Sequence, residues 1–184
     1  MLVACVLIDH FPFKLEARRD PCLTTRPVIV FKRVGSLRTV LDVSSQVQNA
    51  MPGMPLQEAL ANSKDAILIE ADMSKYERAF EYVLLCLSDW SPMVEGADLE
   101  CIYVGLKGID NTYGGEERLI AGLQGSLPRY LQPRLGVSVG KHPAYLAALR
   151  AEPGSLYRTP DDLKEFVAPF SVDVLPVPRK VKLR

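Results

Sequence analysis

Residues 94–108, with the sequence VEGADLECIYVGLKG, place two acidic side chains beside a strongly apolar run. The aliphatic and aromatic residues favour a β-strand, and the flanking glycines indicate turns. Successive side chains of a strand point to opposite faces, so Asp98 and Glu100 should share one face while Cys101 points to the other. Carboxylates on a core strand need a cation or a donor, which makes both candidate metal ligands. The alternative is a solvated strand start, the commoner place for acids.

The beginning of the chain supplies another acid. Residues 2–8 form a continuous apolar run, which is typical of a strand buried on both faces, and Asp9 ends this run. If this strand lies beside the strand at 99–104, Asp9 and Glu100 meet. Carboxylates on neighbouring strands can hold two magnesium ions for phosphoryl transfer. We therefore predict Asp9 and Glu100 as metal ligands of a vestigial or weak catalytic site, with Asp98 as a substitute ligand.

Four segments carry a resemblance to a known family, the Y-family (DinB/UmuC-like) translesion DNA polymerases. Asp9 resembles the family's first metal ligand, and residues 53–59 (GMPLQEA) resemble its fingers motif. Residues 91–95 (SPMVE) resemble the lead-in to the catalytic strand, and residues 99–103 (LECIY) resemble that strand. Each segment alone is weak, but their order and spacing are fairly specific. The resemblance covers residues 2 to about 177.

The resemblance implies an α+β fold, and so does the alternation of strands with helices. We expect a polymerase-type palm, which is a mostly antiparallel sheet with two packed helices, and a small fingers subdomain. The palm is assigned to residues 1–20 and 72–177, the fingers to 21–71, and a basic tail or the start of a thumb to 178–184. The family's thumb and little-finger domains are expected to be absent. The expected helices cover residues 13–20, 44–50, 55–62, 72–90, 116–131, 144–151 and 163–167, and Pro128 should kink or end the helix at 116–131.

The catalytic strand departs from the family pattern. Where the family has adjacent Asp and Glu, this chain has Glu100 and Cys101, so one carboxylate is longer and the other is lost. Phosphoryl transfer depends on positioning and on charge stabilisation, and the lost carboxylate removes part of both. The sequence thus predicts a polymerase fold without a competent polymerase site.

The positions that the family uses to hold the nucleotide also differ. Lys14 stands where the family has an aromatic steric gate against ribonucleotides. Val43 and Gln46 stand where it has a Tyr and an Arg that hold the triphosphate. Glu152 falls on the family's nucleotide-binding Lys, which reverses the charge. These four residues mark the predicted positions of lost nucleotide contacts.

Three further segments, at 10–17, 113–119 and 166–169, resemble the ImuB-type branch of the family. Proteins of that branch have dismantled active sites and serve as hubs of a bacterial mutasome, although they usually lack the acids kept here as Asp9 and Glu100. The resemblance implies a DNA-repair protein of the SOS response that acts without catalysis. Its expected partners are damaged or primer-template DNA, another DNA polymerase and the sliding clamp. Two alternatives stay open, an active magnesium-dependent translesion polymerase and an interaction domain that keeps only the scaffold. Without activity no cofactor is expected.

The composition limits how the chain can meet DNA. The 22 basic and 22 acidic residues give a formal net charge of zero, so any DNA-binding surface must be local. Residues 14–38 hold an excess of basic side chains, and we predict phosphate contacts for Arg33, Arg38 and Lys141, with a solvated face as the alternative. The four cysteines form no CxxC pair, which favours reduced thiols in the cytoplasm. No apolar run is long enough for a membrane span, so no membrane partner is expected.

Overall fold

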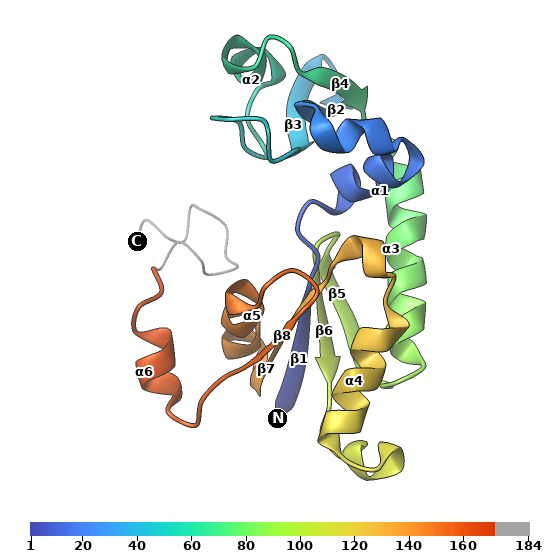
Figure 1. Ribbon diagram of the computed structural model, residues 1–184, viewed down its shortest axis with the longest axis vertical. Coiled ribbons are helices and arrows are strands. Elements are labelled where there is room, and N and C mark those ends of the chain that lie inside the picture. The colour runs from blue at the N-terminus through green and yellow to red at the C-terminus, as the bar shows by residue number, and fades with distance from the viewer. Residues whose placement is uncertain (172–184) are drawn as a thin grey trace. The chain divides into compact units, whose positions relative to one another are not determined.

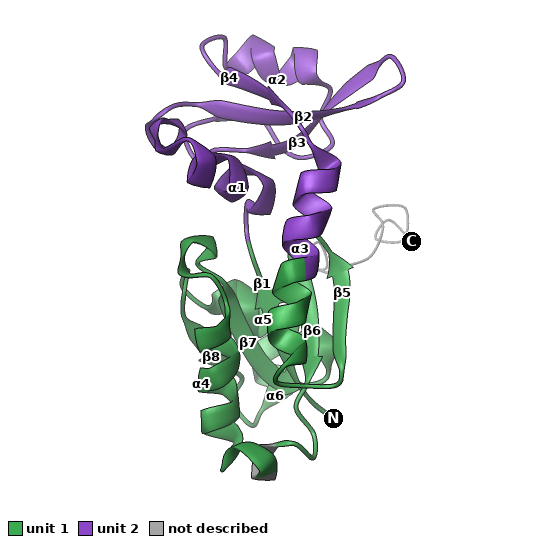
Figure 2. Ribbon diagram, turned by 90° about the vertical axis from the view of Figure 1, so that its right-hand side faces the viewer, with its two compact units in different colours: residues 1–8, 82–184 green, residues 9–81 purple. Residues whose placement is uncertain are grey.

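The computed structural model describes residues 1–171, apart from the side chains of Asp110 and Asn111. The predicted tail or thumb start at 178–184 lies outside the described residues. The chain forms two compact units (Figure 2): unit 1 contains residues 1–8 and the chain from 82 onward, and unit 2 contains residues 9–81. No helix in the described part is long and apolar enough to cross a bilayer.

Unit 1 is built on a five-stranded sheet in the order β5-β6-β1-β7-β8 (Figure 1). Neighbouring strands are antiparallel except for β7 and β8, which confirms the prediction of a mostly antiparallel sheet. The central position of β1 explains why the first apolar run has no polar face. The strands are β1 (Leu2–Leu7), β5 (Val94–Asp98), β6 (Cys101–Gly105), β7 (Arg134–Val139) and β8 (Leu156–Arg158).

Helices cover both faces of this sheet. Helix α4 (Glu116–Ser126) lies on one face and α5 (Lys141–Arg150) on the other (Figures 1 and 2). Side chains of β1 alternate between the two faces, and those on the α5 side pack against Ala144 and Ala148. Both sets are buried, as predicted for residues 2–8. A short helix, α6 (Leu163–Val167), begins at Asp162, whose carboxylate accepts from the backbone N–H groups of two residues in its first turn.

Unit 2 has a three-stranded sheet in the order β3-β2-β4. Strands β2 and β3 form an antiparallel hairpin, whereas β2 and β4 are parallel. One face of this sheet carries a core cluster in which Ile29, Phe31 and Leu56 are buried. The elements are α1 (Phe11–Arg19), β2 (Val28–Val34), β3 (Leu37–Val43), α2 (Leu56–Asn62) and β4 (Ile67–Glu70), and α3 (Met73–Ser88) runs from this unit into unit 1.

Two of the expected elements are wrong, and a third ends next to Pro128, the residue that was expected to kink or end it. Residues 44–50 form turns and no helix, because the Ser44 hydroxyl accepts from the Val28 N–H and donates to the Arg26 carbonyl oxygen. The helix expected at 116–131 ends at Ser126, because Leu127 before Pro128 is extended. The expected single strand within 94–108 is two strands, β5 and β6, that form an antiparallel pair.

The boundaries of the two units fall at different residues from those predicted for palm and fingers. Residues 9–20 belong to unit 2, where α1 packs on β2 and β3. The first part of α3, which begins at Met73, also belongs to unit 2. The assignment of palm and fingers to particular residues stays a prediction.

Candidate active site

The pairing of β1 with β6 brings together the two segments that were predicted to be neighbours. Leu7 lies opposite Cys101 in the register, and the Ile8 N–H donates to the Glu100 carbonyl oxygen at 2.7 Å. The expected adjacency of the first strand and the strand at 99–104 is therefore confirmed. Asp9 is the next residue in the chain after Ile8. The backbone of Glu100 is thus held beside the segment that leads into Asp9.

The two acids of the opening stretch lie on either side of a chain reversal, Asp98 at the end of one strand and Glu100 in the turn that follows. Asp98 is the last residue of β5, and Glu100 precedes the first residue of β6. The Asp98 Oδ1 atom accepts the Glu100 N–H at 2.8 Å, so this carboxylate caps the turn between the strands. Asp98 is exposed and Glu100 is partly exposed. The expectation that both acids share one face of a single strand is wrong. Their exposure agrees with the alternative, in which the acids lie at a solvent-exposed end of the strand.

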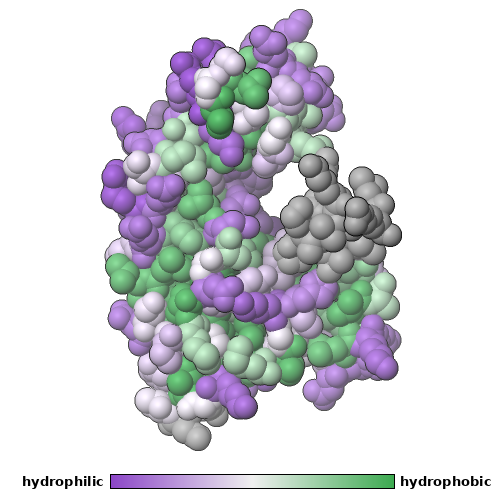
Figure 3. Space-filling view, turned by 180° about the vertical axis from the view of Figure 1, so that it is seen from behind, coloured by the Kyte–Doolittle hydropathy of each residue, from purple (hydrophilic) through white to green (hydrophobic). Residues whose placement is uncertain are grey.

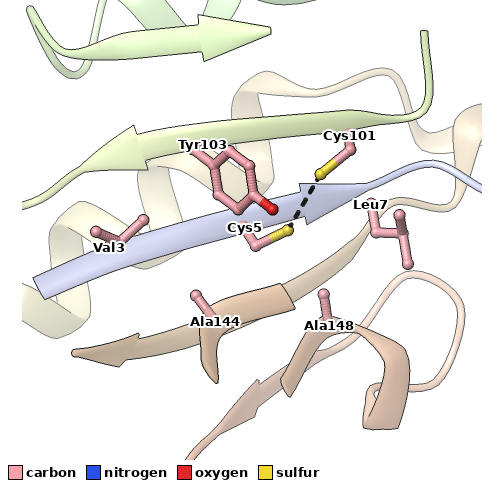
Figure 4. Packing of buried hydrophobic residues seen from close by; sticks show 7 residues of the cluster. All are labelled: Val3, Cys5, Leu7, Cys101, Tyr103, Ala144 and Ala148. Atoms are coloured by element: carbon pink, nitrogen blue, oxygen red, sulfur yellow. Dashed lines mark hydrogen bonds between the residues drawn. The ribbon is translucent and has the colours of Figure 1, made fainter. Parts of the chain in front are cut away.

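Cys101, at the position of the missing carboxylate, points into the core of unit 1. Its Sγ atom lies 3.7 Å from the Sγ of Cys5 on β1 (Figure 4), and both thiols are free and buried. Figure 4 also shows the Tyr103 ring beside the two sulfurs. The contact with Cys101 and burial both raise the pKa of the Cys5 thiol, so it stays protonated at neutral pH. The side chain at position 101 is therefore part of the packing and offers no ligand to solvent.

Thiol labelling tests this packing. We expect iodoacetamide to label the exposed Cys22 first and Cys5 and Cys101 on the order of a hundredfold more slowly, because burial hides both sulfurs from the reagent. Quantitative mass spectrometry of the labelled peptides gives the rates, and urea-unfolded protein is the control in which these sites should become equal. Native-state labelling of Cys101 as fast as that of Cys22 would contradict the structure.

Two of the three predicted nucleotide positions in unit 2, Val43 and Gln46, carry neither a charge nor a hydroxyl group. Val43 is buried in the core cluster of this unit. The Gln46 amide donates to the Thr24 carbonyl oxygen at 2.8 Å, which fixes the loop at 44–50. Lys14 lies in α1 and is partly exposed, and its N–H donates to the His10 carbonyl oxygen. Val43 and Gln46 therefore have structural roles in place of the charge and hydroxyl that the family uses.

The fourth nucleotide position lies in unit 1. Glu152 is exposed in the turn between α5 and β8, where its carbonyl oxygen accepts from the Ser155 N–H at 2.9 Å. An exposed carboxylate repels a triphosphate where a lysine would attract it. The negative charge of Glu152 therefore faces solvent, at the position where the family has a lysine.

The three residues predicted to contact DNA phosphates differ in their surroundings. The Lys141 Nζ lies 2.5 Å from a Glu95 carboxylate oxygen and 5.4 Å from the centroid of the Tyr103 ring. Arg33 lies 3.6 Å from a Glu70 carboxylate oxygen. A nearby carboxylate competes with a phosphate for the same donor. Arg38 lines a surface groove of unit 2. The DNA-binding role of all three stays a prediction.

Sequence reasoning missed a buried carboxylate in unit 2. The Asp42 side chain is 3% exposed and accepts from His10 Nδ1 at 2.7 Å, from the Phe13 N–H at 2.9 Å and from the Val43 N–H at 2.8 Å. His10 has a left-handed backbone with φ of 55°. Asp42 thereby caps the first turn of α1 from a different element. The one signal in the sequence was an Asp within the apolar end of a strand, between Leu41 and Val43.

The side chains that could bind a metal ion are spread over the two units. Among the described residues, no group of three or more His, Cys, Asp or Glu side chains is placed to hold a metal ion. Two-ion sites rely on several carboxylates. Cys101, at the position of the family's carboxylate, lies in the core and supplies no oxygen ligand, and one oxygen of Asp98 caps a turn. The role of Asp9 and Glu100 as metal ligands stays a prediction.

Comparison with known proteins places the chain in a family. A sequence model of the impB/mucB/samB (IMS) family matches residues 6–149. The DNA polymerase IV of Dehalococcoides mccartyi strain CBDB1 is 29% identical over 178 residues, which are 92% of this chain and 45% of that protein. The DNA polymerase IV of Caulobacter vibrioides is 27% identical over 146 residues, or 78% of this chain and 36% of that protein. The chain thus spans about half the length of these relatives or less.

Solved structures show the same fold. The crystal structure of DinB from Sulfolobus solfataricus matches with a TM-score of 0.83 at 20% identity, over 100% of this chain and 56% of that chain. An insertion ternary complex of Dbh DNA polymerase matches with a TM-score of 0.80 at 20% identity, over 96% of this chain and 54% of that chain. These matches confirm the predicted palm and fingers architecture. The paired strands around Ile8 and Glu100, the shared fold and the matching family model together show that this chain belongs to the impB/mucB/samB family of Y-family DNA polymerase-like proteins.

Proposed function

We propose that this chain is a non-catalytic member of its family, which binds DNA or a polymerase during translesion synthesis, as the ImuB-type branch does. The observation that carries the proposal is the position of Cys101. Its thiol packs against Cys5 in the core, at the place where the family pattern has a carboxylate. Phosphoryl transfer at two metal ions needs that charge, because its catalysis is mainly positioning and electrostatic stabilisation.

The nucleotide positions support the same proposal. Val43 is buried, Gln46 is held by the Thr24 carbonyl oxygen, and Glu152 presents the wrong charge. An incoming triphosphate would meet no cation at these three positions. Each lost contact of this type lowers transition-state stabilisation by several kcal/mol in related chemistry, about 3–4 for one charge-stabilising donor. Three losses together with the missing carboxylate would leave synthesis undetectable.

The partners we propose follow from the relatives. Primer-template or damaged DNA is the first, because the relatives are DNA polymerases and one structural neighbour is a polymerase in a ternary complex. Another DNA polymerase and the sliding clamp are the proposed protein partners, in a cytoplasmic SOS response. A chain of zero net charge gains little from long-range attraction to DNA, so its affinity should depend on a local surface and on salt.

A primer-extension assay tests the loss of catalysis. We expect no incorporation on a primed template with Mg²⁺ or Mn²⁺, for the natural chain and for Asp9→Ala alike, because the carboxylate set is incomplete. Gel analysis with a DNA polymerase IV as positive control gives a detection limit. Primer-template affinity is measured separately by fluorescence anisotropy at two salt concentrations. Retained binding without extension is the expected pair of results.

The active alternative has one observation in its favour, the hydrogen bond between Ile8 and Glu100, which keeps Glu100 beside the segment leading to Asp9. Incorporation that disappears in Asp9→Ala would establish that alternative and overturn the proposal. Absence of both extension and DNA binding would leave the scaffold-only role as the reading that fits.

A further inference from the structure

Unit 2 carries a surface groove of ≈ 540 Å³ between α2 and the β2–β3 hairpin. Four leucines, Leu37, Leu56, Leu60 and Leu68, line it together with Pro55 and Arg38. Leu37 is 68% exposed and Leu68 is 42% exposed, so the apolar lining is open to solvent. The volume lies in the range of recognition pockets, about 300–1,000 Å³. Figure 3 shows more generally that hydrophobic residues (green) reach the surface among hydrophilic ones (purple).

The apolar surface continues past the groove onto the tip of the hairpin. Val34 and Leu37 face each other in the register of β2 and β3, and Val34 is 64% exposed. A hairpin tip normally consists of turn-forming residues, and Gly35 and Ser36 are such residues here. Exposed apolar side chains at a tip, next to an apolar groove, mark a surface that another molecule covers.

The charge at the groove is positive and uncompensated. Among the residues that line it, Arg38 is the one with a charge. Arg38 lies directly opposite Arg33 in the register of the hairpin, and like charges in that position destabilise a sheet. Arg33 has Glu70 at 3.6 Å, whereas no ion pair of Arg38 occurs among the described residues. A carboxylate beside Arg38 would relieve this repulsion.

The lining distinguishes a protein from DNA as the occupant. Protein–DNA interfaces are polar and strongly positive, and single strands stack on aromatic side chains. This groove has leucines in place of aromatic residues and one arginine in place of a basic cluster. Apolar anchors with a matching charge at the rim are typical of protein recognition. The surface therefore fits a protein segment better than a phosphate backbone.

We propose that the groove binds a short segment of a partner protein that inserts apolar side chains between α2 and the hairpin and places an Asp or Glu beside Arg38. This deepens the proposed function, on which it partly rests, by naming the surface and the chemistry of the protein partner. Arg38, predicted from the sequence as a phosphate ligand, is thereby assigned to a carboxylate.

A phage-displayed random peptide library on the immobilised, full chain tests the proposal. Enriched peptides should combine at least two apolar residues with an Asp or Glu. A synthetic peptide of the enriched sequence should lose affinity by about tenfold or more in Leu37→Asp and in Arg38→Glu, because each change removes an anchor contact. Met51→Asp and Lys64→Glu are the matched controls, since both residues are exposed on unit 2 but do not line the groove.

The controls separate this proposal from its alternatives. Both control variants should keep the peptide affinity within about twofold, as expected for changes outside a contact surface. No enrichment, enrichment of basic peptides, or equal losses in the control variants would overturn the proposal. A large drop of primer-template affinity in Arg38→Glu without peptide enrichment would assign the groove to DNA. Primer extension by the natural chain would overturn the proposed function and leave the peptide result unaffected.

Discussion

Replacement of Gly136 by alanine should destabilise unit 1 by about 3–5 kcal/mol, enough to unfold a protein of marginal stability. Gly136 lies in β7 directly under α5. A Cβ atom there would overlap the carbonyl oxygen of Ala144 and the backbone nitrogen of Ala148. Backbone atoms cannot rotate away as a side chain can, so the whole helix would have to move. Because α5 also covers β1, that movement would open the core around Cys5.

Urea denaturation followed by circular dichroism measures this effect, and Gly125→Ala is the matched control. Gly125 lies in α4, where a Cβ atom would meet no atom within 4 Å. Alanine should stabilise that helix by about 0.5–1 kcal/mol, because glycine loses more backbone entropy on folding. Equal midpoints for Gly136→Ala and the natural chain would contradict the close approach of α5 to β7.

Asp42→Ala should destabilise unit 2 by about 3–5 kcal/mol. The carboxylate accepts from His10, from the Phe13 N–H and from the Val43 N–H, and alanine would leave all of them without this acceptor. The loss would release the first turn of α1 and the strained backbone of His10, whose φ is 55°. Proteolysis should then cleave between residues 9 and 20 first.

Hydrogen exchange of the α1 amides in the folded chain measures the change. Asp42→Asn keeps one acceptor oxygen and should lose less stability than alanine, whereas the exposed Asp65→Ala should lose less than about 0.5 kcal/mol. Unchanged exchange in Asp42→Ala would mean that its hydrogen bonds do not hold α1.

The parts of the fold that were predictable depend on patterns within a few residues. The run at 2–8 has no polar position, which left a strand buried on both faces as the straightforward reading, and β1 is such a strand. The helix expected at 163–167 is α6, and Asp162 directly before it is a local capping signal. Gly35 and Ser36, the two residues between β2 and β3, are likewise a local turn signal.

The β5–β6 turn was not predictable from local composition. Leu99 and Glu100 are poor turn formers, and no glycine, asparagine or proline stands between the two strands. The turn exists because the Asp98 carboxylate caps it and because β6 pairs with β1 on its other side. Residues on both sides of this turn were therefore predicted as one continuous strand with alternating faces.

The contacts of Cys101 and Asp42 were not predictable for a different reason, the long separation of the partners in the sequence. Cys101 finds its partner Cys5 at a distance of 96 positions in the sequence, and Asp42 finds His10 at 32. No periodicity connects such pairs, because the pairing depends on which strands become neighbours. The resemblance to the family drew attention to position 101, but only the packing shows that its side chain lies in the core.

The discontinuity of unit 1 has a consequence during synthesis on the ribosome. Leu2 pairs with Val139, so β1 must wait for 137 more residues before its sheet can close. At about 5–20 residues per second this takes roughly 7–27 s. Unit 2, which is continuous from residue 9 to 81, can form in that interval. Meanwhile the apolar β1 segment is exposed and has no charge to oppose aggregation, so the nascent chain should be a good client for a ribosome-associated chaperone.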